Sequence, residues 1–256
     1  HSTGVPTGFD LDGDGRLDEP EDAHAFGAFR GAGGLALLSR YPIDTGVIVE
    51  LSGLRWSDFP AADIPAGLPP GAQDVLRLSA TGHWDVPITL PTGRRLHLLT
   101  LHATPPVFDG PEDRNGRRNA DQLRLWADYL NGWRPNGRAA PLARAIVLGT
   151  LNADPLDGEA RPGAVARLLS HPMLQDPEPR AAGAAEASAL QGGVNSSHRG
   201  DPGLDTVDWP EAKQGDPGNL RVDYILPTRS LTVLDSGLHW PGTDTPKARK
   251  RAELAS

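Results

Sequence analysis

Residues 145–152, Ala-Ile-Val-Leu-Gly-Thr-Leu-Asn, form an apolar run that stops at a polar tip. A short, continuous apolar run of this kind is typical of a strand buried inside a sheet. We therefore expect a buried strand that carries Thr150 and Asn152 to one end of a sheet. The 25 Pro and 30 Gly spread along the chain imply many turns and long connections, which argues against a helical bundle.

Two other predicted strands present polar residues at their ends. Residues 95–101 alternate between polar and apolar and leave His102 at the strand end, while Asp223 interrupts an otherwise apolar strand at 221–226. A histidine can act as a general acid or base near neutral pH. A carboxylate in an apolar strand is costly unless a His, an Arg or a metal pairs with it. Taken singly, a histidine such as His102 more often has a structural role, and Asp223 is about as often part of a buried, non-catalytic ion pair. Three polar strand ends together predict a shared active site.

The remaining periodicity predicts a single domain over residues 1–256 in which strands outnumber helices. Apolar residues at i, i+3, i+4 and i+7 predict a helix over 116–131, and Pro162 marks the start of a short helix at 162–169. A long irregular connection is expected over 176–220. This pattern favours a mixed, largely antiparallel sheet system with helices outside. Further strands are expected at 35–39, 47–51, 76–78, 84–90, 220–226 and 231–234.

Charge and composition limit the function. The formal net charge of −8 argues against tight binding to nucleic acids, because Lys and Arg contacts to phosphates supply most non-specific affinity for them. The same charge suits a protein that binds cations. Disulfides are excluded because the chain has no Cys, and no apolar run approaches the ~18 residues of a transmembrane segment.

The acidic segment 10–21 matches the twelve-residue calcium loop. Gly15 permits its sharp turn, and Asp22 could replace the final ligand. Because Pro6 precludes an entering helix, we expect a calcium loop without flanking helices, which would tie down a long irregular segment. The alternative is an acidic, solvated turn. The predicted Ca²⁺ ligands are Asp10, Asp12, Asp14, the backbone carbonyl of Arg16, Asp18 and Glu21.

The ordered set of motifs resembles the endonuclease/exonuclease/phosphatase superfamily, the metal-dependent phosphoesterases related to pancreatic-type DNases. The matching pieces are residues 34–43, the strand that ends in His102, the turn 149–152 and the strand 221–226. Residues 104–116 and the Asp-Gly-rich start look like a bacterial, exported branch. The resemblance implies a four-layer α/β sandwich, with two mixed, mostly antiparallel sheets packed face to face and helices outside. It also implies a secreted or periplasmic protein, which we expect to be a monomer.

By this resemblance the protein hydrolyses a phosphodiester or phosphomonoester substrate with the help of Mg²⁺ or a similar divalent ion. His102 would bind or protonate the phosphoryl group, and Asn152 would orient the phosphate or a metal-bound oxygen. Asp223 would belong to an Asp–His pair. The predicted substrate contacts are Arg114, Asn115 and Arg118, although a solvated loop and a helix start explain these residues equally well.

The sequence departs from the family pattern at Thr150, because the family turn reads Gly-Asp-x-Asn. A Thr hydroxyl is no useful base at neutral pH, and loss of a general base typically lowers the rate by ~10²–10⁴. Asp154 lies past the turn and His239 lacks an adjacent Asp, so neither is expected to substitute for the missing groups.

Completeness is the other open question. The family's early Asn and Glu strands would precede His1, and its closing Ser-Asp-His would follow Ser256. We therefore expect a chain that is incomplete at both ends and inactive by itself. Two alternatives are a degenerate member that binds a phosphorylated ligand or partner without turnover, and a calcium-stabilised adhesion module.

Overall fold

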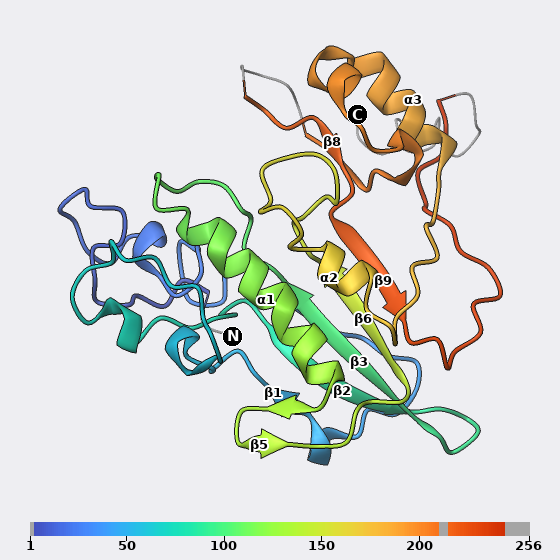
Figure 1. Ribbon diagram of the computed structural model, residues 1–256, viewed down its shortest axis with the longest axis horizontal. Coiled ribbons are helices and arrows are strands. Elements are labelled where there is room, and N and C mark those ends of the chain that lie inside the picture. Colours follow the sequence, from blue (N-terminus) through green and yellow to red (C-terminus); the bar gives the residue numbers. More distant parts are fainter. Residues whose placement is uncertain (1–2, 210–214, 244–256) are drawn as a thin grey trace.

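The computed structural model describes residues 3–209 and 215–243 (Figure 1). Within them, five strands form one mixed sheet in the order β1-β2-β3-β6-β9, and two further pairs form small hairpin-like sheets. Within the described residues, no helix is long and apolar enough to cross a membrane.

The large sheet contains β1 (Val49–Glu50), β2 (His83–Thr89), β3 (Arg95–His102), β6 (Ala145–Thr150) and β9 (Asp223–Pro227). The small sheets pair β4 (Trp133–Arg134) with β5 (Gly137–Arg138), and β7 (Val207–Asp208) with β8 (Asn219–Leu220). The helices are α1 (Arg114–Leu130), α2 (Ala166–Leu169) and α3 (Ala182–Gln191), and the 3-10 turns are Pro20–Asp22, Thr45–Val47, Trp56–Asp58, Ala72–Asp74, Gly193–Ser197 and Pro202–Leu204.

The centre of the sheet is a strand–helix–strand unit. β3 and β6 run parallel and are connected through α1, whereas β9 runs antiparallel to β6. The carboxyl ends of β3 and β6 therefore meet at one edge of the sheet, and β9 begins at that same edge. In open α/β sheets, this is the kind of edge at which ligands bind.

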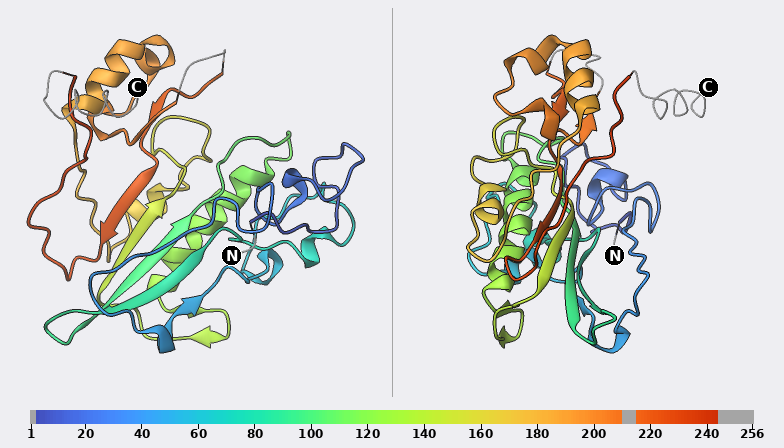
Figure 2. Two further views of the ribbon diagram at one scale, coloured as in Figure 1. Left: turned by 180° about the vertical axis from the view of Figure 1, so that it is seen from behind. Right: turned by 90° about the vertical axis from the view of Figure 1, so that its right-hand side faces the viewer.

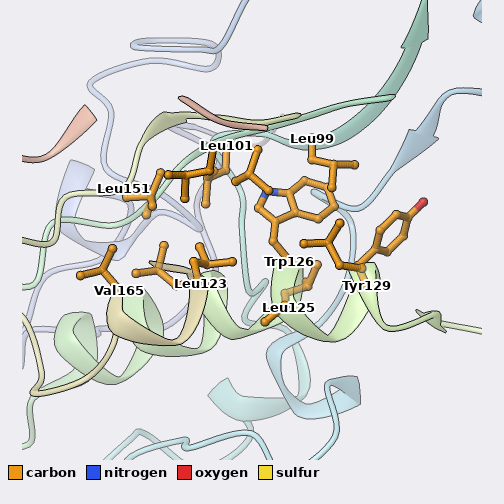
Figure 3. Packing of buried hydrophobic residues seen from close by; sticks show 14 of the residues in the cluster. Leu99, Leu101, Leu123, Leu125, Trp126, Tyr129, Leu151 and Val165 are labelled. Carbon is orange, nitrogen blue, oxygen red and sulfur yellow. The ribbon is translucent and has the colours of Figure 1, made fainter. Parts of the chain in front are cut away.

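Helix α1 covers one face of this sheet. Its apolar side places Leu123 and Trp126 against Leu99 and Leu101 of β3, and all four side chains are fully or almost fully buried (Figure 3). Alternation along β3 turns the intervening residues, including His102, toward the opposite face. α1 and α2 lie on one side of the sheet, and part of the N-terminal segment lies on the other (Figure 2).

The α/β class is as predicted, but the layers differ from the expected sandwich. Among residues 3–209 and 215–243 there is one large sheet, not two packed face to face. The predicted strand at 35–39 is wrong: the segment has no strand pairing, and Leu38 is 92% exposed. An apolar run becomes a strand only when a neighbouring strand accepts its backbone hydrogen bonds. Likewise, the strands predicted at 76–78 and 231–234 do not form, although Arg77 makes an isolated bridge with Arg55.

Two predictions in the second half of the chain also need correction. The connection predicted to be irregular over 176–220 contains α3, whose Ala-rich sequence has high helix propensity but little amphipathic periodicity. The single strand predicted at 220–226 is divided between β8 and β9, which belong to different sheets. By contrast, the strands expected at 84–90, 95–101 and 145–149 and the helix at 116–131 are confirmed within a few residues.

Candidate active site

The strand register brings the three predicted polar residues together at the sheet edge. His102 is paired with Thr150 across β3 and β6, and Thr150 is paired with Asp223 across β6 and β9. Directly opposed residues lie on the same face of a sheet. The Thr150 hydroxyl donates a 2.6 Å hydrogen bond to Oδ1 of Asp223. The three polar strand ends therefore form a contiguous row at this edge, and a shared active site there stays a prediction.

Gly149 makes this close packing of strand ends sterically allowed. Its φ of +137° lies where side-chain-bearing residues are rarely found. A Cβ at this position would lie 2.0 Å from the backbone oxygen of Leu101 in β3. Only glycine therefore permits β6 to approach β3 at this point, one residue before Thr150.

The electrostatic environment of His102 favours a neutral imidazole. Desolvation lowers the pKa of His102 below 6.5, and the nearby Asp223 carboxylate partly opposes that shift. A neutral imidazole keeps one N–H donor and one acceptor nitrogen. At neutral pH, His102 can therefore donate a hydrogen bond to a phosphoryl oxygen without carrying a positive charge.

The chain beyond each strand end is also held in place. Asn152 adopts a left-handed conformation with φ of +50°, and its Nδ2 donates to the carbonyl oxygen of Ala103 at 2.8 Å. The backbone N–H of Ala103 in turn donates to the carbonyl of Thr150. The two loops that leave β3 and β6 are thus bonded to each other. Asn152, predicted to contact substrate or metal, also has a structural part in this arrangement.

Two residues of α1 that sequence reasoning missed support these loops. Nδ2 of Asn119 donates to the carbonyls of Thr104 and Leu151 at 2.8 and 2.9 Å. Oε1 of Gln122 accepts from the N–H of Thr104 at 2.7 Å. Both side chains are buried on the apolar side of the helix. Polar residues at the i and i+3 positions of an apolar helix stripe were the signal that could have revealed them.

The carboxylate of Asp223 has no histidine donor in the part of the chain that the structure describes. The backbone N–H of Asp223 donates a hydrogen bond to Oγ1 of Thr206, a residue that the sequence analysis did not single out. His239 lies on an exposed segment beside α3. This position agrees with the expectation that His239 does not replace the missing histidine partner of Asp223. Asp154 accepts backbone hydrogen bonds from Leu156 and Arg221, so its carboxylate is occupied in shaping the turn.

The three residues predicted to contact substrate all make structural contacts, and for Arg114 and Asn115 the substrate contact stays a prediction. Arg114 donates to the carbonyl of Leu11, and Nδ2 of Asn115 donates to the carbonyl of Val107. The assignment of Arg118 needs correction, because its guanidinium is buried and donates to the backbone carbonyls of residues 24, 77 and 78. Burial lowers the pKa of Arg118 to about 9, and Arg114 adds repulsion. Because the side chain is buried and its Nε and Nη2 are bonded to backbone carbonyls, Arg118 is not placed to contact a substrate.

The acidic loop brings together three carboxylates that could hold a metal ion, and they include Asp22, the alternative final ligand named from the sequence. Carboxylate oxygens of Asp10, Asp12 and Asp22 lie within 4.8 Å of one another. Asp22 is only 1% exposed, whereas Glu21 is exposed, because Pro20 starts a 3-10 turn that directs the two neighbouring side chains differently. Asp14, Asp18 and Glu21 do not join the cluster. As expected, no α-helix flanks the loop within the described residues.

Comparison with known proteins assigns the chain to a family. The sequence model of the endonuclease/exonuclease/phosphatase family matches residues 4–245. The chain belongs to this family. The match confirms the recognition made from the ordered motifs, together with the α/β fold class that they implied. A search among curated proteins found no match.

Three solved structures resemble the chain at low sequence identity. Sphingomyelinase C from Streptomyces griseocarneus is 18% identical, with a TM-score of 0.43 over 77% of this chain and 52% of that one. An endonuclease/exonuclease/phosphatase from Beutenbergia cavernae is 17% identical, with a TM-score of 0.43 over 77% of this chain and 40% of that one. A β-hairpin deletion mutant of β toxin from Staphylococcus aureus is 14% identical, with a TM-score of 0.36 over 64% and 49%. The chain therefore spans about half of the length of the structures that it resembles.

Proposed function

We propose that the protein containing this chain hydrolyses a phosphoester at the sheet edge formed by His102, Thr150 and Asp223. The observation that carries the proposal is the register that places these residues side by side, with Thr150 bonded to Asp223. The family match supports the same class of reaction. A secreted or periplasmic location, predicted from the exported branch that the sequence resembles, is part of the proposal.

Each residue has a role that its surroundings support. His102 donates a hydrogen bond to a phosphoryl oxygen and neutralises part of the charge that develops there. The Asp223 carboxylate is the hard oxygen ligand at this edge, and one or two carboxylates with substrate phosphate are the usual ligands of Mg²⁺. A divalent ion held there would draw electron density from the phosphoryl group. Thr150 fixes the orientation of Asp223 through its hydroxyl, and Asn152 lines the adjoining turn.

Thr150 also favours a second candidate function. Because its hydroxyl donates to Asp223 and carries no charge, the edge has one carboxylate where the family motif implies two. A site of this kind can hold a phosphorylated ligand without hydrolysing it. Binding without turnover is therefore the alternative to the proposed hydrolysis.

The proposed hydrolysis is tested by replacing His102. We expect the His102→Asn variant to lose about 100-fold in Mg²⁺-dependent hydrolysis of bis(p-nitrophenyl) phosphate, because the donor to the phosphoryl oxygen is displaced. The assay should use the full-length protein. The His239→Asn variant is the matched control and should retain full activity. Equal activity of the His102→Asn variant and the unmodified protein would refute the assignment of the site.

We also propose that the acidic loop binds Ca²⁺ through Asp10, Asp12 and Asp22. Three convergent carboxylates are strongly repulsive without a cation, and Ca²⁺ prefers oxygen ligands of this kind. The ion would anchor the irregular N-terminal segment, whose few ties to the domain include the bonds from Arg114 to Leu11 and from Arg118 to His24. Its role would be structural.

The calcium proposal predicts different effects for two neighbouring substitutions. We expect the Asp22→Asn variant to lose the heat of Ca²⁺ binding in a calorimetric titration, because a buried ligand is neutralised. The Glu21→Gln variant should keep it, because Glu21 is exposed outside the cluster. For the unmodified protein, Ca²⁺ at about 100 times its dissociation constant should add about 3 kcal/mol to the free energy of unfolding. If Glu21→Gln abolishes the heat of Ca²⁺ binding and Asp22→Asn keeps it, the final ligand is Glu21, as the loop spacing predicts.

A further inference from the structure

A hollow of about 390 Å³ lies between the edge strand β1 and the β4–β5 hairpin. Figure 1 shows this hairpin directly beside β1. Because β1 and β9 are opposite edges of the large sheet, the hollow is separate from the polar row on β3, β6 and β9. Small-ligand sites in proteins have volumes of this order. The lining includes the apolar residues Val49, Leu51, Leu54 and Pro135, together with Glu50 and Arg134.

Arg134 supplies a fixed positive charge to this hollow. Its Nη1 donates to the backbone carbonyls of Tyr129 at 2.8 Å and Trp133 at 2.6 Å, and its guanidinium carbon lies 3.5 Å from the centre of the Tyr129 ring. Among residues 3–209 and 215–243, no carboxylate pairs with Arg134, and no acceptor is bonded to its Nε or Nη2. Nε and Nη2 form one edge of the guanidinium, and such an edge binds both oxygens of a carboxylate through parallel hydrogen bonds. Arg134 therefore offers a preorganised carboxylate site.

The edge of β1 offers backbone groups to the same hollow. The N–H of Leu51 donates to the carbonyl of His83 at the start of β2, so the N–H and carbonyl of the preceding residue, Glu50, point away from β2. In the part of the chain that the structure describes, β1 pairs with no strand other than β2. An unpaired edge of this kind can accept an extended peptide as an additional strand.

The carboxylate of Glu50 is held away from Arg134. It accepts from the N–H of Ser52 at 2.7 Å and from Nε1 of Trp84 at 3.1 Å. Successive side chains of a strand point to opposite faces, so this carboxylate lies on the other face of the sheet from the buried Leu51. Arg134 lies on the same face as Leu51, because it contacts Tyr129 of the covering helix α1. A negatively charged ligand at Arg134 therefore meets apolar side chains of β1, and not the Glu50 carboxylate.

We propose that this hollow binds the C-terminal end of a short apolar peptide. The terminal carboxylate is bonded to Nε and Nη2 of Arg134, and the last peptide N–H donates to the carbonyl of Glu50. An apolar side chain of the peptide packs against Val49 and Leu54, which are only partly buried. Since the chain has a formal net charge of −8, binding of an anion depends on this local cation and not on the overall charge. Binding in this hollow is independent of the proposed hydrolysis.

Titration calorimetry with matched ligands tests the peptide site. We expect the unmodified protein to bind N-acetyl-leucyl-leucine about tenfold more tightly than the corresponding carboxamide, because a hydrogen bond to a charged acceptor is stronger than one to a neutral acceptor. N-acetyl-leucyl-proline should bind more weakly than the leucyl-leucine acid, because proline lacks the N–H that donates to the carbonyl of Glu50. Equal binding of acid and carboxamide, or no heat from either ligand, would overturn the proposal.

Two arginines of the same hairpin separate a specific carboxylate site from a general effect of charge. Arg134→Gln should abolish the preference for the acid, and Arg134→Lys should keep part of it, because the charge remains while the paired donors are lost. Arg138 is exposed on β5 and donates to the carbonyl of Asn131, so Arg138→Gln should leave the preference unchanged. Equal losses in Arg134→Gln and Arg138→Gln would contradict the assignment. If Arg134→Gln does not fold, the comparison of acid and carboxamide in the unmodified protein still decides the result.

Discussion

Replacing Thr150 with Asp is expected to raise Mg²⁺-dependent phosphodiester hydrolysis by about 10²–10⁴-fold. The new carboxylate would stand beside His102 and directly opposite Asp223, at the position where the family turn has its Asp. It would add the base and the second carboxylate that the edge lacks within the described residues. Steady-state hydrolysis of bis(p-nitrophenyl) phosphate by the protein with its flanking sequence measures the change.

The same substitution has a second readout that does not depend on turnover. Two carboxylates at this distance cannot both ionise without a cation, so one pKa rises and the metal-free protein loses stability. Mg²⁺ should therefore raise the melting temperature of the Thr150→Asp variant more than that of the Thr150→Asn variant, its uncharged control. If the Asp variant gains metal-dependent stability but no activity, Thr150 is not what limits catalysis. Unchanged activity with no metal response would exclude Thr150 from the metal site.

Replacing Gly149 with Ala is expected to lower the free energy of unfolding by about 3–5 kcal/mol. The added Cβ would lie 2.0 Å from the carbonyl oxygen of Leu101, which is backbone and cannot rotate away. The strand pair that carries His102 and Thr150 would have to separate. Urea denaturation monitored by tryptophan fluorescence measures the loss.

Gly93 supplies the matched control for this prediction. It also has a positive φ, of +75°, but a Cβ there would meet nothing within 4 Å. The Gly93→Ala variant should therefore lose only about 1 kcal/mol, which is the cost of the backbone conformation alone. Similar losses in the two variants would mean that close approach of β6 to β3 does not constrain Gly149.

The sequence predicted those elements correctly whose pattern of polar and apolar side chains lies within one segment of the chain. The alternating segment that forms β3, the apolar run that forms β6 and the helical stripe of α1 are predicted from side-chain patterns within a few residues of their bounds. The run 35–39 has the same composition but forms no strand, because no neighbour pairs with it. Periodicity reports what a segment can bury, whereas pairing depends on residues elsewhere in the chain.

The site residues divide in the same way. His102, Thr150 and Asp223 were singled out because each is a polar residue at the end of a predicted strand, and their roles in a reaction stay predictions. Arg118 was assigned to the substrate site because a charged residue near the start of a helix is usually exposed, whereas in the structure its side chain is buried. In the acidic loop, the spacing left Glu21 and Asp22 as alternatives for the final position, and the 3-10 turn Pro20–Asp22 places Asp22 beside Asp10 and Asp12.

The sequence alone determined which residues are candidates for the chemistry, because the polar strand ends, the Gly149 turn and the Thr150 departure can each be recognised within a short segment. Only the tertiary structure decided that His102, Thr150 and Asp223 are neighbours, since the register between three strands depends on hydrogen bonds between distant segments. It also decided that Asn115 holds the backbone on both sides of Phe108, through Val107 and Asp109. The local side-chain pattern specifies which residues lie on each face of a strand or helix. Long-range backbone pairing specifies which residues of other strands those residues contact.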